Sequence, residues 1–403
     1  MNTRVVYLFS ILALLISKVQ GQVVNTGQEI HLDANSLFYV NDNYRHDDGL
    51  ISGDGTFELK GNLNNSSSKN VFESTSKATV SLSGNTQNIN GTLVNFPNLS
   101  LSGNGDKNLN TDANILSSLS LTDRLLNIAD NKLSVLNPAP NAIGRTTGFI
   151  TSNEKGALIR NTNSNSPYLF PLGSTKNNPS FKAFNSIDIN PLYRPVIFEP
   201  ENSDANTFAA NLVNQNPDFQ YPLSSRMSDI EKVSDKYYFI LDHTAGNSKF
   251  KVKFLQVKAV ENNAAVVLWS ASKSRWEKVS TGVEEGILGD RLDRSMQFTS
   301  SPEMANQVVS FADIPFVFFN AFSPDGDGKN DTWQIKNIEL YPDNTLTIFN
   351  RWGDEVYKTR GYSNTNGWDG GNLQPGTYFY VLNVKVNGGD NTYKGFITMV
   401  KKN

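Results

Sequence analysis

The sequence predicts an all-β protein built from three parts: an N-terminal parallel β-helix, a middle antiparallel β-sandwich and a small C-terminal β domain. In the first third of the chain, pairs of apolar residues recur roughly every 20 residues. In the middle, longer runs of alternating apolar and polar residues replace that repeat. In the last part, short runs rich in aromatic and β-branched residues are separated by Gly, Asp and Pro.

The composition excludes several kinds of site. With 403 residues, the chain is long enough for two or three domains. A net charge of −3 gives no electrostatic signature for binding nucleic acid or an anionic membrane. The absence of cysteine excludes disulfides, thiol catalysis and cysteine-ligated metals. A histidine zinc site or a Ser-His-Asp triad would need long-range convergence, because His31, His46 and His243 lie far apart and form no HExxH motif.

The first 21 residues are predicted to be a cleavable signal peptide. Arg4 precedes an apolar run at 5–17, and Val19 and Gly21 provide small residues at the −3 and −1 positions of a cleavage site. The alternative, a membrane anchor, needs about 20 apolar residues, and this run is too short. We therefore expect export, with cleavage between Gly21 and Gln22.

Residues 22–165 are predicted to form the β-solenoid. The repeated unit is an apolar-x-apolar triplet followed by small or polar residues, often Gly-Asn, and successive units start 19, 23, 19, 20 and 14 residues apart. One coil cannot bury its own inward pair, whereas stacked coils form a continuous core. An antiparallel sandwich with coincidental spacing is the alternative. The pairs expected to point inward are Phe38/Val40, Phe57/Leu59, Val80/Leu82, Leu99/Leu101, Leu119/Leu121 and Leu133/Val135.

Residues 166–316 are predicted to form an antiparallel β-sandwich. Here the repeat stops, and alternating runs are separated by turn clusters, a pattern typical of sandwiches. Trp269 and Trp276 are expected to pack in its core or at its edge rather than to form a ligand platform. The runs expected to be strands are 195–198, 208–213, 236–241, 250–254, 264–269 and 307–311.

Residues 317–403 carry five short motifs that are specific in combination. In chain order they read SPDGDGKND, IFNRWG, WDG, GTYFY and KG. Strands are expected at 345–349, 377–384 and 396–400. The motif residues are Ser323, Pro324, Asp325, Gly326, Asp327, Gly328, Asn330, Asp331, Phe349, Asn350, Arg351, Trp352, Gly353, Trp368, Asp369, Gly370, Gly376, Thr377, Tyr378, Tyr380, Lys394 and Gly395.

With these motifs, the segment resembles the gliding-motility-associated C-terminal domain, the type B sorting signal of the type IX secretion system in Bacteroidota. The resemblance departs at one place, since the stretch between Trp368 and Gly376 is shorter than the family usually carries. It implies an immunoglobulin-like β-sandwich that the type IX translocon and its accessory proteins recognise. It also implies passage across the outer membrane, to its outer face or to the extracellular space.

The Asp-Gly loop of the first motif has two interpretations. Oxygen atoms of Asp325, Asp327, Asn330 and Asp331 lie on a Gly-rich turn, an arrangement that suits a hard cation such as calcium. The loop is not an EF-hand, because no Glu closes a twelve-residue loop. Asp-Gly steps also favour turns that are fixed by side-chain hydrogen bonds without any ion. No other cofactor is expected.

The part of the chain before the sorting motifs is predicted to be a non-enzymatic surface or secreted protein, adhesin-like or gliding-associated. Acidic residues of the solenoid, such as Glu58 beside Lys60, do not stack at the coil period. No Trp occurs before Trp269 to serve as a sugar platform. The alternative is a secreted carbohydrate-binding protein or a polysaccharide-degrading enzyme on a β-helix scaffold, which would need two convergent carboxylates in unequal environments.

One polar-aromatic patch also has two interpretations. It could cap the first coil, since terminal coils need a polar cover, or it could bind a glycan. Surface glycans and other surface proteins are thus the expected partners of this part of the chain. The patch comprises Tyr39, Tyr44, Arg45, His46, Asp47 and Asp48.

Overall fold

The computed structural model describes residues 5–7, 21–174, 193–257, 263–289, 292–300, 302–386 and 389–400. Its regular structure is almost entirely β, as predicted. The helices of the described residues are three single turns, η1 (Pro217–Phe219), η2 (Ile338–Leu340) and η3 (Asn364–Asn366). None of them is long and apolar enough to cross a membrane. The predicted signal peptide lies almost wholly outside the described residues, and the structure leaves its cleavage site a prediction.

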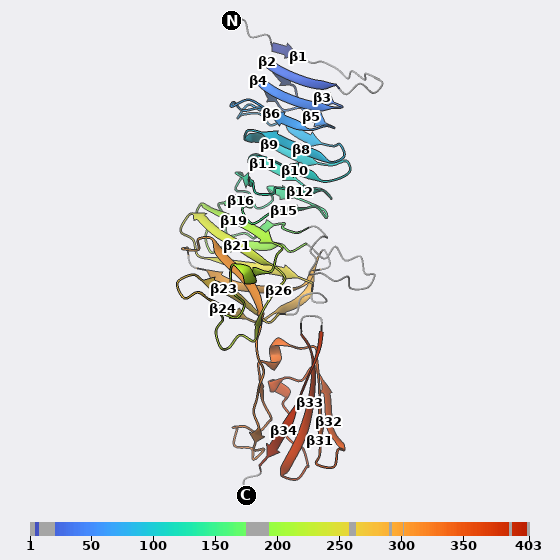
Figure 1. The fold of residues 1–403 in the computed structure, drawn as a ribbon, viewed down its shortest axis with the longest axis vertical. Helices are drawn as coiled ribbons and strands as arrows, with labels where there is room; N and C mark the ends of the chain where they lie inside the picture. The colour runs from blue at the N-terminus through green and yellow to red at the C-terminus, as the bar shows by residue number, and fades with distance from the viewer. Residues whose placement is uncertain are drawn as a thin grey trace. The chain divides into compact units, whose positions relative to one another are not determined.

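The first part of the chain is a β-solenoid, which confirms the prediction from the repeat. Figure 1 shows its strands stacked one above another, from blue to green. Neighbouring strands within each solenoid sheet pair in parallel. The first sheet has the order β1 (Val5–Tyr7), β2 (Gln22–Leu32), β4 (Asn43–Gly53), β6 (Leu63–Asn65), β8 (Gln87–Gly91), β10 (Lys107–Leu109), β12 (Leu125–Asn127) and β15 (Phe149–Thr151).

The second solenoid sheet contains the predicted inward pairs. Val80 lies beside Phe57 on one side and beside Leu99 on the other, and Leu99 in turn lies beside Leu119. All twelve predicted inward side chains are buried except Phe38, which is half-buried. The sheet consists of β3 (Leu37–Val40), β5 (Thr56–Leu59), β7 (Thr79–Leu82), β9 (Val94–Leu101), β11 (Ala113–Ser120), β13 (Lys132–Val135) and β16 (Ala157–Thr162), with β14 (Ile143–Gly144) beside β11.

The last predicted step of the stack is wrong. Leu133 does not follow Leu119: it pairs with Ala113, whereas Leu119 pairs with Ile143. The register of β11 shifts between Ile115 and Ser118, and its first half pairs with β13 whereas its second half pairs with β14. The spacing of 14 residues separates Leu119 from Leu133, which pair with different strands. The partner of Leu119 is Ile143, 24 residues further along the chain.

Asparagine side chains form ladders along the outside of the solenoid. The Asn88 Nδ2 donates to Asn62 Oδ1 at 3.2 Å, and the Asn108 Nδ2 donates to Asn88 Oδ1 at 3.1 Å. Because each side-chain amide both donates and accepts, a column of Asn residues on successive coils can hydrogen-bond to one another. A second ladder runs parallel to the first, through Asn64, Asn90 and Asn110.

After the solenoid, the strands pair antiparallel. Strand β16 pairs with β19 (Asn206–Val213), and β19 pairs with β21 (Tyr238–Ala245). Each of the six runs predicted to be strands in this region overlaps an observed strand, with bounds that differ by a few residues. The remaining strands are β17 (Tyr168–Phe170), β18 (Val196–Pro200), β20 (Lys232–Val233), β22 (Phe250–Gln256), β23 (Ala265–Ser270), β24 (Arg275–Thr281), β25 (Glu284–Gly289), β26 (Leu292–Ser300) and β27 (Gln307–Asp313).

The chain forms two compact units. One comprises Met1–Gln215, Lys236–Phe254 and Gln297–Val309. The other comprises Asn216–Asp235, Leu255–Met296 and Ser310–Asn403. The middle of the chain therefore contributes strands to both units.

The C-terminal region contains a five-stranded sheet and a two-stranded one. The larger has the order β29 (Ala321–Phe322), β34 (Gly389–Met399), β33 (Gly376–Val386), β31 (Asn344–Phe349) and β32 (Glu355–Arg360). The smaller pairs β28 (Val317–Phe318) with β30 (Ile335–Lys336). Strand β34 begins seven residues before the predicted start at 396, because its polar first half pairs along β33. Strand β32 was not predicted from the sequence.

Candidate recognition surface of the C-terminal domain

The C-terminal fold brings motifs that are far apart in sequence to adjacent strands. Tyr380 on β33 lies directly between Ile348 on β31 and Gly395 on β34. These three residues belong to three different motifs. The first motif starts after Phe322, which pairs with Met399 on β34. The motifs therefore define one connected region of the domain.

Gly395 is required because the Tyr380 ring lies across it. A Cβ at position 395 would be 2.5 Å from the Tyr380 hydroxyl oxygen, closer than real Cβ contacts. The Tyr380 ring also packs 4.9 Å from the Trp333 ring and 5.0 Å from the Phe318 ring. Glycine on one strand thus makes room for an aromatic side chain from its neighbour.

Trp368, from the third motif, is a core residue of the domain. Its ring lies 5.2 Å from that of Phe322 and 5.3 Å from that of Tyr378, between centroids. Gly370 has a φ of 79° and leaves no space for a Cβ, which would lie 2.2 Å from the Met399 sulfur. These motif residues therefore build the domain, and a binding partner cannot reach their buried rings.

Buried tyrosine hydroxyls satisfy backbone groups in this core. The Tyr362 hydroxyl donates to the Trp333 carbonyl at 2.5 Å and accepts from the Trp368 N–H at 3.0 Å. Burial raises the pKa of Tyr362, so the hydroxyl keeps its proton and remains a donor. The same holds for Tyr341, whose pKa is also raised by burial.

The second motif forms a tight turn that exposes a tryptophan. The Asn350 side-chain oxygen accepts hydrogen bonds from the N–H groups of Trp352 at 2.9 Å and Asp354 at 3.0 Å. Gly353 adopts a φ of 91°, which other residues rarely reach. The Trp352 side chain is 76% exposed, and the Arg351 guanidinium carbon lies 4.9 Å from its ring centroid. The turn therefore presents an aromatic and a cationic side chain on the surface, accessible to a partner.

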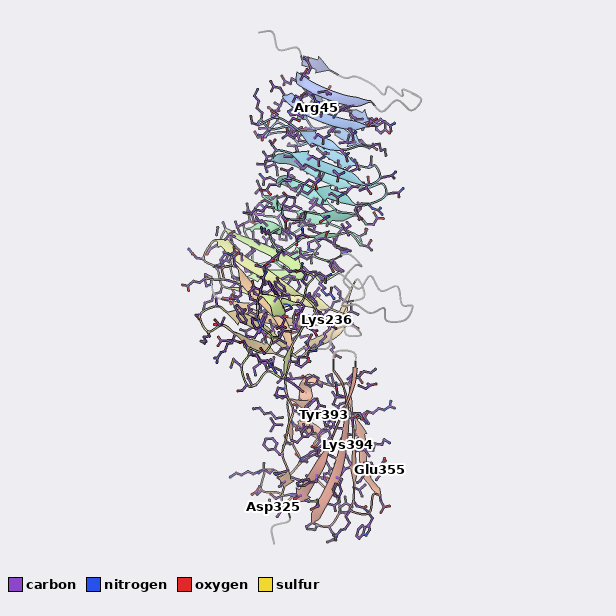
Figure 2. The ribbon with its side chains drawn as sticks, in the orientation of Figure 1. Arg45, Lys236, Asp325, Glu355, Tyr393 and Lys394 are labelled. Atoms are coloured by element: carbon purple, nitrogen blue, oxygen red, sulfur yellow. The ribbon has the colours of Figure 1, made fainter. Side chains whose placement is uncertain are left out.

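The Asp-Gly loop has features of a cation site and of a hydrogen-bonded turn. Oxygen atoms of Asp325, Asp327 and Asp331 lie within 4.8 Å of one another, the only such cluster of His, Cys, Asp or Glu in the described part of the chain. Asn330 has a left-handed backbone with a φ of 55°. Figure 2 labels Asp325 in this loop.

Hydrogen bonds within the loop use those same carboxylates. Asp331 accepts from the N–H groups of Gly326 at 2.7 Å and Gly328 at 2.8 Å, and Asp327 accepts from that of Lys329 at 2.8 Å. The turn is thus complete without an ion, while the clustered oxygens retain lone pairs for one. Calcium binding stays a prediction.

The polar-aromatic patch of the solenoid is divided by the fold. Tyr44 and His46 are buried, and burial raises the pKa of Tyr44 to about 12 and lowers that of His46. Tyr39 is 46% exposed, and the Arg45 guanidinium pairs with Asp47 at 2.6 Å on the surface. Strand β2 pairs along the whole of β4, so the patch residues on β4 do not cover the end of the solenoid, and the capping interpretation is wrong for them. Tyr39 lies on β3, the edge strand of the second sheet.

The other residues considered as candidates for a site take part in ion pairs, core packing and hydrogen bonds. The Lys60 Nζ lies 3.2 Å from the Glu58 Oε1, as expected for a solvated outer face. The Trp276 side chain is fully buried and lies 5.6 Å from the half-buried Trp269 ring on the neighbouring strand. His243 contacts the Asn206 side-chain oxygen at 3.0 Å and stacks on Phe208.

Residues 316–399 match the family described as the CHU_C Type IX secretion signal domain. The matched segment contains all five motifs. No curated protein and no solved structure matches the chain. The chain therefore carries a C-terminal sorting domain of type B. This domain implies interaction with the type IX secretion machinery and export to the cell surface or the extracellular space.

Proposed function

We propose that this protein is a non-enzymatic surface or released protein, adhesin-like or gliding-associated, that the type IX system carries across the outer membrane. The observation that carries the proposal is the secretion signal domain at 316–399, attached to a long β-solenoid. A solenoid offers an extended surface built from repeated coils, which suits adhesion. The sorting domain would supply export, and the remainder would supply the surface function.

The non-enzymatic part of the proposal is supported by the solenoid's acidic side chains. Asp47 pairs with Arg45, Asp48 with Lys69 at 2.8 Å, and Glu58 with Lys60. A glycosidase needs two carboxylates that face one substrate in unequal environments. Surface pairs with cations leave these carboxylates similar to one another.

The finer architecture belongs to the same proposal. We propose that the middle strands form an antiparallel β-sandwich and that the C-terminal domain is an immunoglobulin-like sandwich. The antiparallel pairs of β19 with β21 and of β18 with β22 support the first. The five-stranded and two-stranded sheets of the C-terminal region support the second, because the ring of Phe318 on the smaller sheet stacks on that of Tyr380 on the larger one.

A carbohydrate-binding protein is the second candidate, and the asparagine ladders favour it. Asn88 and Asn90 belong to two parallel ladders on one outer face of the solenoid. Each ladder amide uses one N–H for its neighbour and keeps donors and acceptors for hydroxyl groups. Binding of oligosaccharides to the purified protein would distinguish this function from protein–protein adhesion.

Export is tested by removing and transplanting the sorting segment. Deletion of residues 317–403 should leave the protein in the periplasm, and fusion of 317–403 to a foreign exported protein should release that protein. Fractionation of cells measures both. Surface delivery of the truncated protein at normal levels would overturn the proposal.

A further inference from the structure

We propose that the outer face of the sheet formed by β31–β34 docks on the secretion machinery, and that its partner is a protein surface with an apolar centre and an acidic rim. The inference rests on the proposed type IX export and names the surface that export uses. The sheet face is defined by Phe349, Phe379, Phe396, Lys394 and Arg360.

An aromatic row crosses this face. Phe379 on β33 pairs directly with Phe349 on β31 and with Phe396 on β34, so the three side chains lie on the same side of the sheet. Phe379 is 47% exposed and Phe396 is 56% exposed, while Phe349 is half-buried. Tyr378 and Tyr380, the chain neighbours of Phe379, point to the core and are each 6% exposed. The two tyrosines therefore pack in the core, whereas the phenylalanine row faces solvent.

An aromatic row across a solvated sheet face needs a reason. The outer face of an antiparallel sheet normally carries polar side chains, and adjacent exposed aromatics are a liability for solubility. Beyond the aromatic row, Thr345 and Asn383 form a polar row on this face, and Val381 between the two rows is half-buried. Aromatic anchors near the centre of a patch are typical of the residues that dominate protein–protein binding.

The charges around the row are predominantly basic. Lys394 is two residues from Phe396 on the same strand and so shares its face, and Arg360 pairs with Thr345 on that face. Among the described residues, neither Lys394 nor Arg360 has an ion-pair partner, whereas Lys358 pairs with Glu355 at 3.4 Å. Figure 2 shows Lys394 and Glu355 on the strands of this sheet. Unpaired cations beside an aromatic row complement a partner with acidic groups around an apolar centre.

The same charges argue against a lipid surface as the occupant. Attraction to anionic lipid typically requires about four to eight clustered Lys or Arg residues. Among its described residues this face carries Lys358, Arg360, Lys385 and Lys394, but the carboxylates of Glu355 and Asp390 lie on the same face, so the cations do not form an uninterrupted basic cluster. A sheet face with a three-residue aromatic row and charges of both signs fits a protein surface better.

The test uses the full-length protein in secreting cells. The double variant Phe379→Thr/Phe396→Thr should lower the secreted fraction about tenfold or more, because it removes the two exposed aromatic anchors. Lys394→Glu should lower it more than Lys394→Gln, because it places like charges against an acidic rim. The matched controls are Phe319→Thr and Lys336→Glu, which change exposed residues elsewhere on the same domain and should leave secretion unchanged. Thermal melting of each purified variant checks that it is folded.

The outcomes separate this inference from the export proposal. If deletion of 317–403 blocks secretion but the folded sheet-face variants are secreted normally, export by the domain stands and the docking face is wrong. If the deletion itself has no effect, the export proposal fails. Binding of the purified protein to anionic vesicles that the Phe379/Phe396 variant abolishes would assign the face to lipid and overturn a protein partner. Loss of secretion in the controls as well would also overturn the assignment to this face.

Discussion

The hydroxyl of Tyr341 binds both backbone groups of Ile314: it accepts from the Ile314 N–H at 2.8 Å and donates to the Ile314 carbonyl at 2.9 Å. Both residues are buried. Ile314 lies two residues before the segment that matches the secretion signal family. The hydrogen-bonded structure of the C-terminal domain therefore begins earlier than its sequence motifs.

Tyr341→Phe should destabilise the C-terminal domain without changing its fold. The substitution removes one oxygen and leaves a buried N–H and a buried carbonyl of Ile314 without their partner, which typically costs about 1–3 kcal/mol per group. Denaturant unfolding of the full-length protein measures the loss. Tyr357→Phe, at a half-buried tyrosine of the same domain, is the control. Equal stability of Tyr341→Phe and the wild type would contradict the role assigned to this hydroxyl.

Leu101→Asp should strongly destabilise the solenoid, whereas Ser100→Asp should be nearly neutral. Leu101 is fully buried beside Leu82, and an unpaired carboxylate there costs several kcal/mol. Ser100 is half-buried on the outer side of the same strand. Thermal melting followed by circular dichroism compares the two variants. A similar loss of stability in both would argue against the observed register.

Lys107 should make stability rise as the pH increases from about 8 towards 10.5. Its side chain is fully buried in the solenoid, and its Nζ donates to the Gly84 carbonyl at 2.9 Å, the Asn85 carbonyl at 2.7 Å and the Gln87 Oε1 at 2.8 Å. Burial lowers the pKa of Lys107 from 10.5 to about 8. Between these values the unfolded chain binds more protons than the folded one, so raising the pH favours folding.

The rise should reach about 3 kcal/mol at most, the free energy that corresponds to this pKa difference. Denaturant unfolding at several pH values between 7.5 and 10.5 measures it. Lys107→Met should have lower stability at every pH, because three acceptors lose their donor, but should lack the rise. A rise of the same size in Lys107→Met would assign it to another group.

Calcium and chelator should distinguish the two interpretations of the Asp-Gly loop. If the carboxylates of Asp325, Asp327 and Asp331 bind calcium, the full-length protein should melt higher in millimolar calcium than in chelator, and Asp327→Ala should remove the difference. The loop's own hydrogen bonds fix the turn without an ion. Identical melting curves in calcium and chelator would therefore identify it as a hydrogen-bonded turn.

Much of the architecture is encoded locally and can be predicted from the sequence. The inward pairs from Phe57 to Leu121 follow from period-2 alternation repeated near 20 residues, because a strand buries every second side chain and a coil needs a neighbour above and below. The sorting domain follows from five motifs whose glycines and buried aromatics are required by close packing. Gly395 is one example, since only glycine leaves space for Tyr380.

Other features depend on which strands pair with one another, and only the tertiary structure shows that. The alternation of Tyr378, Phe379 and Tyr380 says that Phe379 faces away from the tyrosines, but only the packing against Trp333 shows which side is the core. Lysine is usually exposed, yet carbonyl groups of the preceding coil surround the Lys107 ammonium group inside the solenoid. Likewise, Leu133 pairs with Ala113 rather than with Leu119, because the two halves of β11, on either side of a register shift, pair with different strands. Periodicity fixes which side chains share a face, whereas pairing between distant segments determines what that face contacts.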